Sequence, residues 1–360
     1  MREGSSVLVF PAWRDNPFLN MLALAARAEG HRFLGSTTYD GLLLQLRRLG
    51  AGDVLHVHWT HPLLQTAETA DDAEVRLERL REQFAELSDR GVSVVWTIHN
   101  HLPHELSYAD AERRLYRLLA DAANAIHVMA PATPEVVSDV VALDAAKVRI
   151  IPHPSYEGIY DTSIDRASAR ASFDLAATDR AVLFLGQIRP YKGVDSLISA
   201  AAAASLPDQD IVLMLAGAIR EIPLDDFVAS VPDELRTITH LSFVDDGDIG
   251  RWFRAADIAV FPYRAILNSG SLHLAASFHT PAILPDEPHL RAQFGDERWV
   301  AFFDPARPSE SIAELLSDPS LFADVDAADF RAFADPISPW EVSRRYAALL
   351  DELGASATAR

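Results

Sequence analysis

The sequence predicts an α/β protein built from two doubly wound domains, and three observations support this. The chain has 360 residues, a length that accommodates two average domains. Short apolar runs typical of buried parallel strands recur along it and alternate with helical patterns. Polar or glycine-containing segments follow several of these runs, where a doubly wound sheet binds its ligands.

Composition limits the class of protein. A net charge of −20 argues against a general nucleic-acid-binding protein, although it permits a local cationic pocket. The absence of cysteine excludes disulfides, thiol nucleophiles and cysteine-bound zinc, and it fits a reducing cytoplasm. The N-terminus lacks an apolar signal region, and no apolar run approaches the ~18 residues that cross a bilayer. We therefore expect a soluble, cytoplasmic protein.

The first half opens with a strand expected at Val7–Phe10 and a helix expected over Phe18–Glu29. The loop between them offers four side chains that could bind a saccharide: Trp13, Arg14, Asp15 and Asn16. The indole could stack on a sugar face, and the polar groups could hydrogen-bond its hydroxyls. Asp15 or Asn16 could equally cap the helix, with Pro17 in its first turn.

Two further strands, Asp53–Trp59 and Val92–Ile98, each lead into histidines. Alternation along the first strand places His56 and His58 on one face. Six histidines lie between positions 56 and 104, but they lack the spacing of helical zinc ligands, so no metal site is predicted. A histidine of ordinary pKa suits acid/base or oxyanion chemistry at neutral pH. The candidates for the catalytic role are His99, His104 and Glu105.

The rest of the first half alternates helices and strands. Ala111–Ala123 reads as an amphipathic helix with three arginines near one side; it could touch a membrane surface, although a solvated cationic face is the simpler interpretation. A strand at Ala125–Met129 and a helix near Pro134–Val141 follow. The strand Lys147–Ile151 then leads to a Pro-His-Pro turn, and the domain boundary is expected between positions 152 and 170.

The second half opens with an anion-binding pattern. The apolar run Ala181–Leu185 predicts a buried strand, Gly186 permits a tight turn, and a helix begins near Val194. Arg189 offers a planar fork and Lys192 a point charge, beside the free amides at the start of the helix. A diphosphate suits this arrangement, and the alternative is an ordinary strand-to-helix connection with solvated cations.

The rest of the second half again alternates strands with turns and helices. A strand at Ile211–Leu215 ends at Gly217, where backbone can approach a ligand closely. A strand at Ile238–Val244 leads to an acidic turn at Asp245–Asp248, which lacks calcium-loop spacing and is expected to cap the next helix. A second anion cradle is expected at a helix start formed by Asn268, Ser269, Gly270 and Ser271.

The residue pattern near the end of the chain predicts a capped amphipathic helix over Val342–Leu353. Trp340, just before it, is expected to be a packing anchor rather than a binding residue. The last residues, 354–360, are expected to fray.

The segment Gly186–Val194 resembles the one that opens the donor-binding domain of GT-B fold, nucleotide-sugar glycosyltransferases of the glycosyltransferase-4-like superfamily. Further similar segments are Thr97–Asn100, Pro152–Tyr156 and Ala256–Tyr263, so the resemblance covers nearly the whole chain. It implies two Rossmann-like domains facing a cleft, with a C-terminal helix that crosses back to the first. The implied boundaries are 1–155 for an acceptor-binding domain, 156–337 for a donor-binding domain and 338–360 for the crossing helix.

The resemblance also implies an activity. A hexosyltransferase of this kind moves a sugar from a UDP- or GDP-sugar to a hydroxyl of a saccharide, lipid-linked or small-molecule acceptor, without a metal or other cofactor. Bacterial relatives act in polysaccharide and natural-product biosynthesis. No nucleic acid and at most peripheral membrane contact are implied. Arg189 and Lys192 match the residues that contact the donor diphosphate, and His99 matches the histidine that faces the donor sugar.

Combining the resemblance with the residues gives the expected sites. The donor site is expected at Arg189, Lys192, Gly217, Asn268, Ser269, Gly270 and Ser271. The acceptor site is expected at Trp13, Arg14, Asp15, Asn16 and His58.

The chain departs from the retaining branch of this superfamily at the donor loop, where Ile266 and Leu274 replace two glutamates. Ribose and sugar recognition then need other groups, such as His273, Asp286 or Glu287. The departure leaves both inverting and retaining transfer open. It also keeps two other classes in view, a catalytically silent sugar-nucleotide-binding protein and a GT-B-like epimerase.

Overall fold

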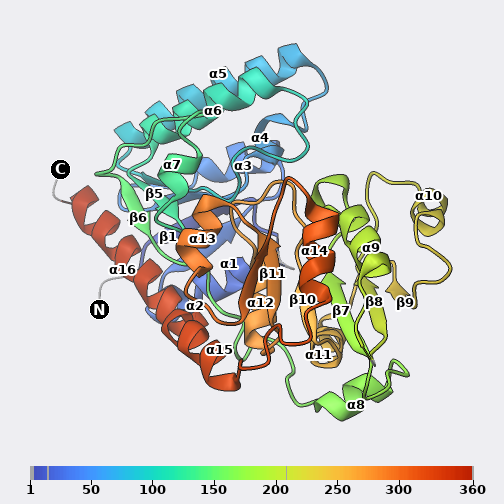
Figure 1. Ribbon diagram of the computed structural model, residues 1–360. Coiled ribbons are helices and arrows are strands. Elements are labelled where there is room, and N and C mark those ends of the chain that lie inside the picture. The colour runs from blue at the N-terminus through green and yellow to red at the C-terminus, as the bar shows by residue number, and fades with distance from the viewer. Residues whose placement is uncertain (1–3, 14–15, 208, 359–360) are drawn as a thin grey trace. The chain divides into compact units, whose positions relative to one another are not determined.

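The computed structural model describes residues 4–13, 16–207 and 209–358 (Figure 1). The chain divides into two compact units. The first comprises Met1–Pro154 together with Pro339–Arg360, and the second comprises Ser155–Ser338. Each unit is a six-stranded parallel sheet covered by helices on both faces, so the predicted pair of Rossmann-like domains is confirmed.

The sheet of the first unit has the strand order β2-β1-β3-β4-β5-β6. Its strands are β1 (Ser6–Phe10), β2 (Arg32–Gly35), β3 (Val54–Val57), β4 (Ser93–Thr97), β5 (Ala125–Val128) and β6 (Val148–Ile150). β3, β4 and β5 are buried along their whole length, including the polar side chains of His56, Thr97 and His127.

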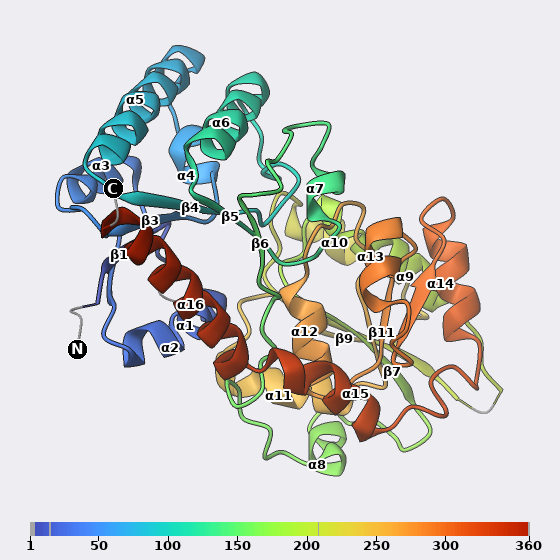
Figure 2. The ribbon, with the colours of Figure 1, turned by 90° about the vertical axis from the view of Figure 1, so that its left-hand side faces the viewer.

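Helices cover both faces of this sheet. They are α1 (Pro17–Leu22), α2 (Leu24–Ala28), α3 (Tyr39–Leu46), α4 (His61–Leu64), α5 (Ala70–Asp89), α6 (Ala109–Ala122), α7 (Thr133–Val136) and α16 (Pro339–Thr358). Figure 2 shows α3, α5 and α6 on one side of the strands and α1, α2 and α16 on the other. α5 buries the stripe of Ala73, Leu77, Leu80, Phe84 and Leu87.

The C-terminal helix α16 packs on the first unit, against α1, α2, β3 and β4, as expected. Tyr346 and Leu350 are almost completely buried. Residues 354–358, which were expected to fray, remain helical, and Gly354 lies beside Ser5 at the start of the first strand. Trp340, the expected anchor, is 51% exposed, whereas Pro339 beside it is buried.

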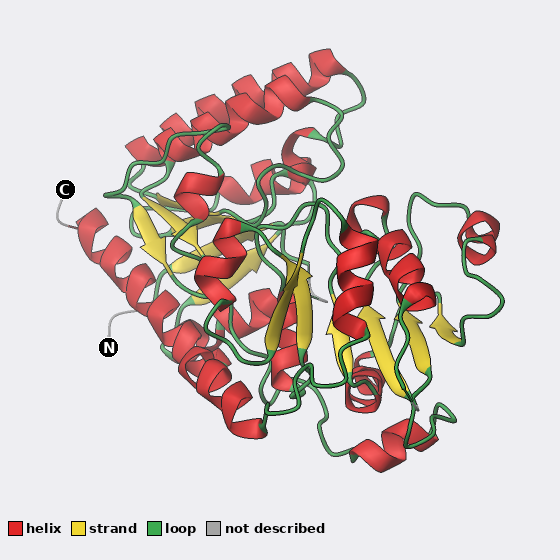
Figure 3. Cartoon of the chain, viewed as in Figure 1, coloured by secondary structure: helices red, strands yellow, loops and turns green. Residues whose placement is uncertain are grey.

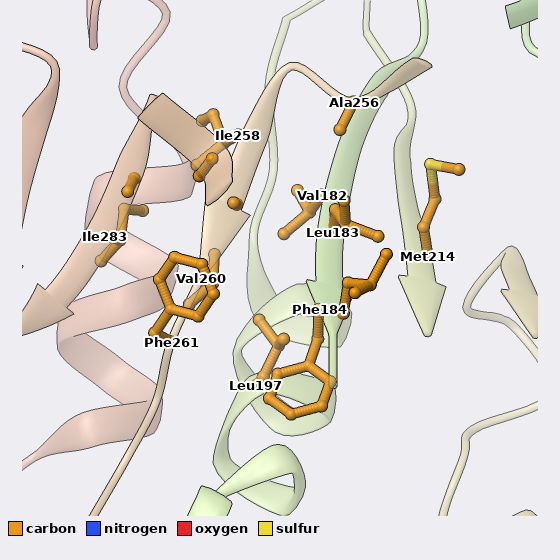
Figure 4. Close-up of a cluster of buried hydrophobic side chains, with 14 of the residues drawn as sticks. Val182, Leu183, Phe184, Leu197, Met214, Ala256, Ile258, Val260, Phe261 and Ile283 are labelled. Atoms are coloured by element: carbon orange, nitrogen blue, oxygen red, sulfur yellow. The ribbon is translucent and has the colours of Figure 1, made fainter. Parts of the chain in front are cut away.

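The sheet of the second unit has the order β12-β11-β10-β7-β8-β9. Its strands are β7 (Arg180–Leu185), β8 (Ile211–Ala216), β9 (Thr237–His240), β10 (Ile258–Val260), β11 (Ala282–Pro285) and β12 (Val300–Phe303). Side chains of β7, β8, β10, β11 and α9 form its core, among them Phe184 and Leu197 (Figure 4).

The helices of the second unit are α8 (Arg166–Ala171), α9 (Val194–Ala203), α10 (Leu224–Ala229), α11 (Asp246–Ala255), α12 (Gly270–Ser277), α13 (Pro288–Phe294), α14 (Pro308–Leu316) and α15 (Ala327–Ala334), with 3₁₀ turns η1 (Pro190–Lys192) and η2 (Asp335–Ile337). α9 and α14 pack together over one face of the sheet, and α8 and α11 pack together on the other (Figure 3).

Some boundaries differ from the prediction. The helix expected over Phe18–Glu29 is interrupted at Ala23, which separates α1 from α2. β9 ends at His240 instead of Val244, because the His240 ring bonds the Phe243 carbonyl at 3.0 Å and the chain turns there. Asp245 occupies the cap position of α11, but its side chain makes no capping hydrogen bond.

The packing of α16 predicts a large stability effect at one position. Replacing the fully buried Leu350 by alanine should lower the free energy of unfolding by about 2 to 5 kcal/mol, because it leaves a cavity against the first sheet. Urea unfolding followed by circular dichroism measures this. Leu44→Ala on α3 is the control, since Leu44 is 63% exposed and should cost under about 0.5 kcal/mol. Equal losses would mean that α16 does not complete the core.

Candidate functional site

Glycine is required in the turn after β7, where the first anion site was predicted. Gly193, between η1 and α9, has a φ of 66°, a conformation that costs other residues energy. A Cβ at this position would also collide with the carbonyl oxygen of Pro262, at the end of β10. Both the backbone conformation and the lack of space therefore require glycine at position 193. The turn that it permits brings Lys192 and the amino end of α9 to the carboxyl edge of the sheet.

The segments that follow β7, β8 and β10 meet at Gly186. A Cβ at Gly217, after β8, would collide with the carbonyl oxygen of Gly186, so the two turns touch through backbone. On its other side, the Cβ position of Gly186 is 3.9 Å from the hydroxyl of Ser271, in the first turn of α12. Ser269 caps that helix by accepting a hydrogen bond from the Leu272 amide at 3.3 Å. Parts of both predicted anion cradles thus lie around one glycine.

The two predicted cations lie on this edge with protein partners. Arg189 donates to the Glu221 carboxylate at 2.9 Å and to the Gln187 amide oxygen at 3.0 Å. The ammonium nitrogen of Lys192 lies 3.7 Å from the centroid of the Tyr263 ring. Both cations are about half-buried, where attraction to an anion is screened less than in open solvent.

The donor loop has a different arrangement from the one expected for sugar recognition. Desolvation lowers the pKa of the buried His273 to about 4, so its ring is neutral and donates from Nδ1 to the Ser269 carbonyl at 2.9 Å. His273 therefore supports the capped end of α12. Asp286 accepts two hydrogen bonds from Arg291, both at 2.8 Å. Glu287 is the third residue suggested to replace the missing glutamates, and it occupies the cap position at the start of α13.

The first unit gathers imidazoles at the carboxyl ends of β3 and β4. His58 Nδ1 lies 3.0 Å from His99 Nε2, and the His99 ring stacks on Trp59 with centroids 3.9 Å apart. Desolvation, followed by the neighbouring histidines, lowers the pKa of His58 and His99 well below the usual value. Both rings are therefore neutral at pH 7, and one donates to the other.

A chain of hydrogen bonds crosses the same sheet below this pair. Tyr346 Oη lies 2.7 Å from His56 Nδ1, His56 Nε2 lies 2.7 Å from Thr97 Oγ1, and His127 Nδ1 lies 2.9 Å from Thr97 Oγ1. The chain ends where His127 Nε2 meets the Ile151 carbonyl at 2.8 Å. A carbonyl only accepts, so each neutral ring has a fixed tautomer and every bond runs from Tyr346 toward Ile151.

The other predicted residues are scattered. His104 and Glu105 are exposed, and Glu105 lies 3.4 Å from His61. Asn16 caps α1 through the Phe18 amide at 3.0 Å, which confirms its capping role. Trp13 is 39% exposed and packs on Trp59, with ring centroids 4.8 Å apart. Arg14 and Asp15 lie outside the described residues.

Several residues of this cluster had not been predicted. Trp59, Thr97, His127 and Tyr346 all contact the histidines. The alternation in β3 did indicate that His56 and His58 share a face, and their ring centroids are 3.9 Å apart. The partners come from other strands and from α16, and no local pattern pairs them.

Two further observations concern the described residues. They contain no group of three or more His, Asp or Glu side chains placed to hold a metal ion. None of their helices is both long and apolar enough to pass through a lipid bilayer.

Comparison with known proteins adds to this geometry. Residues 179–318 match the family of glycosyl transferases group 1. The chain is 27% identical over 276 residues to GDP-mannose:glycolipid 4-beta-D-mannosyltransferase of Xanthomonas campestris pv. campestris, covering 74% of this chain and 70% of that protein. It is 30% identical over 122 residues to D-inositol 3-phosphate glycosyltransferase of a Mycobacterium species, covering 33% of this chain and 27% of that protein.

The fold is that of solved glycosyltransferase structures. Anabaena HepE in complex with UDP and glucose superimposes with a TM-score of 0.69 at 14% sequence identity, covering 97% of this chain and 100% of HepE. At this identity the likeness concerns the fold, and it confirms the expected GT-B architecture.

The buried His127 predicts a pH effect on stability. Its pKa is lowered by desolvation to about 4, whereas an unfolded imidazole titrates near 6.5. The unfolded state therefore binds more protons between these values, and stability falls as the pH is lowered from 7 to 4. His127 alone accounts for about 3 kcal/mol of that loss. Urea unfolding across this range measures it.

His127→Gln provides the comparison, because glutamine does not titrate. This variant should be less stable than the parent at pH 7 and lose less stability on acidification. An unchanged slope would contradict the neutral state of His127.

Proposed function

We propose that this chain is a nucleotide-sugar-dependent glycosyltransferase that transfers a hexose from a UDP- or GDP-sugar held by the second unit to a hydroxyl of an acceptor held by the first. The observation that carries the donor assignment is the meeting of the turns after β7 and β8 with the start of α12 at Gly186. Arg189 and Lys192 lie on the same sheet edge.

The second unit supplies the groups that a departing diphosphate needs. The guanidinium of Arg189 exchanges Glu221 for phosphate oxygens, and Lys192 adds a point charge. Amides in the first turn of α12 point outward from a capped helix start, where the helix dipole favours negative charge. These fixed donors stabilise the charge that develops on the leaving group.

His99 is the proposed catalytic group of the first unit. Its pKa is well below the usual value, so it is a weak base at neutral pH. This favours hydrogen bonding by a neutral ring to the transferred sugar over proton abstraction from the acceptor. His58 fixes one nitrogen of that ring, which supports a defined tautomer at the reaction centre.

The names of the similar proteins indicate which donors and acceptors to consider. GDP-mannose and a glycolipid are named for one, inositol 3-phosphate for another, and UDP with glucose is bound to HepE. A lipid-linked, saccharide or small acceptor fits these names. Membrane contact of this chain is at most peripheral, and α6 is a weak candidate for it because Arg114 already pairs with Glu74 of α5. A nucleotide-sugar donor and a cysteine-free chain suit the cytoplasm.

A silent sugar-nucleotide-binding protein is the second candidate. Ile266 and Leu274 offer no side-chain hydrogen bond where the retaining branch has glutamates, and this observation favours lost activity. Release of free nucleoside diphosphate from UDP- or GDP-sugars decides the matter. Turnover or slow donor hydrolysis supports the enzyme, whereas donor binding without release, across a panel of acceptors, supports the silent protein.

The donor site predicts a nucleotide-dependent stabilisation. UDP or GDP at 100 times its Kd should add about 2.7 kcal/mol to the stability of the unit that binds it and raise the Tm by about 5 to 11 °C. Arg189→Ala should abolish most of this shift.

Arg236→Ala is the matched control, since Arg236 is also ion-paired but lies at the opposite, amino-terminal edge of the sheet. It should keep the full ligand-induced shift relative to its own baseline. No shift with UDP, GDP, dTDP or ADP would refute the nucleotide-sugar donor.

His99→Ala should lower kcat about 100-fold or more, because it removes the proposed catalytic group, while the affinity for UDP or GDP stays within about twofold. Steady-state transfer or donor hydrolysis, combined with calorimetry, measures both. His101→Ala is the control, because His101 lies two positions away and pairs with Asp139 at 2.7 Å. Equal losses in the two variants would remove His99 from the reaction.

A further inference from the structure

A groove of about 400 Å³ opens in the first unit at the carboxyl ends of β1 and β2. Its lining includes Trp13, Asn20, Arg27, Phe33, Ser36 and Thr37. Gly35 is required in its wall, because a Cβ there would collide with the side chain of Ala12. The Ala12 amide also donates to the Ser36 carbonyl at 2.8 Å, so the wall is held by backbone.

The charge of this groove is opposite to that of the chain. Acidic residues outnumber basic ones by 52 to 32 overall, yet no aspartate or glutamate is among the described residues that line it. Arg27 is the cation among its described lining residues. The guanidinium lies over the Phe33 ring, 4.8 Å from the centroid, and no carboxylate among the described residues pairs with it. An exposed guanidinium held on an aromatic face presents its remaining N–H donors to a ligand.

The aromatic side of the groove leads to the proposed catalytic residue. Trp13 packs on Trp59, and Trp59 stacks on His99 with the ring planes 17° apart. A saccharide that packs on Trp13 is therefore separated from the His99 imidazole by the indole rings of Trp13 and Trp59. Hydroxyl and amide side chains beside an exposed indole are typical of sugar recognition, and a guanidinium adds selectivity for an anion.

We propose that this groove binds the acceptor as an anionic saccharide, with Arg27 gripping a carboxylate or phosphate substituent and Trp13 packing on a sugar face. The inference rests on the proposed transferase function and adds the substrate class of its acceptor side. It assigns Arg27 to substrate selection and not to the chemical step. A neutral acceptor leaves this guanidinium without a partner of opposite charge among the residues that the structure describes.

Binding in the absence of donor tests the proposal. Methyl β-D-glucuronide, α-D-glucose 1-phosphate and the neutral methyl β-D-glucoside are titrated against the full chain, and Kd is measured by ligand-observed NMR. At least one anionic probe should bind about tenfold or more tightly than the neutral glucoside, and the better anion tells a carboxylate from a phosphate. Arg27→Gln should abolish that preference, and Arg27→Lys should restore part of it.

Arg32→Gln is the matched control, because Arg32 is an exposed arginine at the other end of β2 and does not line the groove. It should keep the preference for the anion. Equal affinity for charged and neutral probes, no binding of any probe, or the same loss in both glutamine variants overturns the assignment. UDP and GDP binding to each variant is measured in parallel, so failure of the groove is distinguished from failure of the donor site.

Discussion

The parallel direction of every strand pair in both sheets decides where this protein can do chemistry. Parallel strands need crossover helices, which cover both faces and leave only the ends of the strands open. All carboxyl ends in a sheet then share one edge. In the second unit that edge carries Gly186, Arg189 and Lys192, and in the first it carries His99 and the groove of Arg27.

Burial determines how the two edges differ in charge. In the first unit the histidines are so desolvated that their pKa values fall and the rings work as neutral hydrogen-bonding groups. Their chain of hydrogen bonds satisfies each buried ring without introducing a buried charge. In the second unit the cations stay at the rim, charged, and are partnered by Glu221 or an aromatic face. The histidine cluster of the first unit thus offers neutral donors and acceptors, whereas the turns of the second unit offer positive charge.

The sequence was sufficient for features that depend on local pattern. Apolar runs predicted the buried strands, the segment around Gly186 and Lys192 predicted the turn between β7 and α9, and alternation predicted the common face of His56 and His58. It did not predict β2 or β12, which are short and only partly buried. Nor did it predict the Glu221 partner of Arg189 or the contact between His56 and Tyr346, residues 290 positions apart. Such pairs depend on how distant elements pack, and neither residue type nor spacing encodes them.

The helix α16 belongs to the first unit, although the whole of Ser155–Ser338 separates it from the rest of that unit along the chain. Synthesis proceeds from the N-terminus, and domains generally fold as they emerge. Here the second unit is contiguous and can close as soon as it leaves the ribosome, whereas the first waits until α16 has been translated. Until then its apolar face is uncovered and His56 lacks its hydroxyl donor. The domain whose synthesis begins first is therefore completed after the second unit, and its nascent form is the one that most needs protection from aggregation.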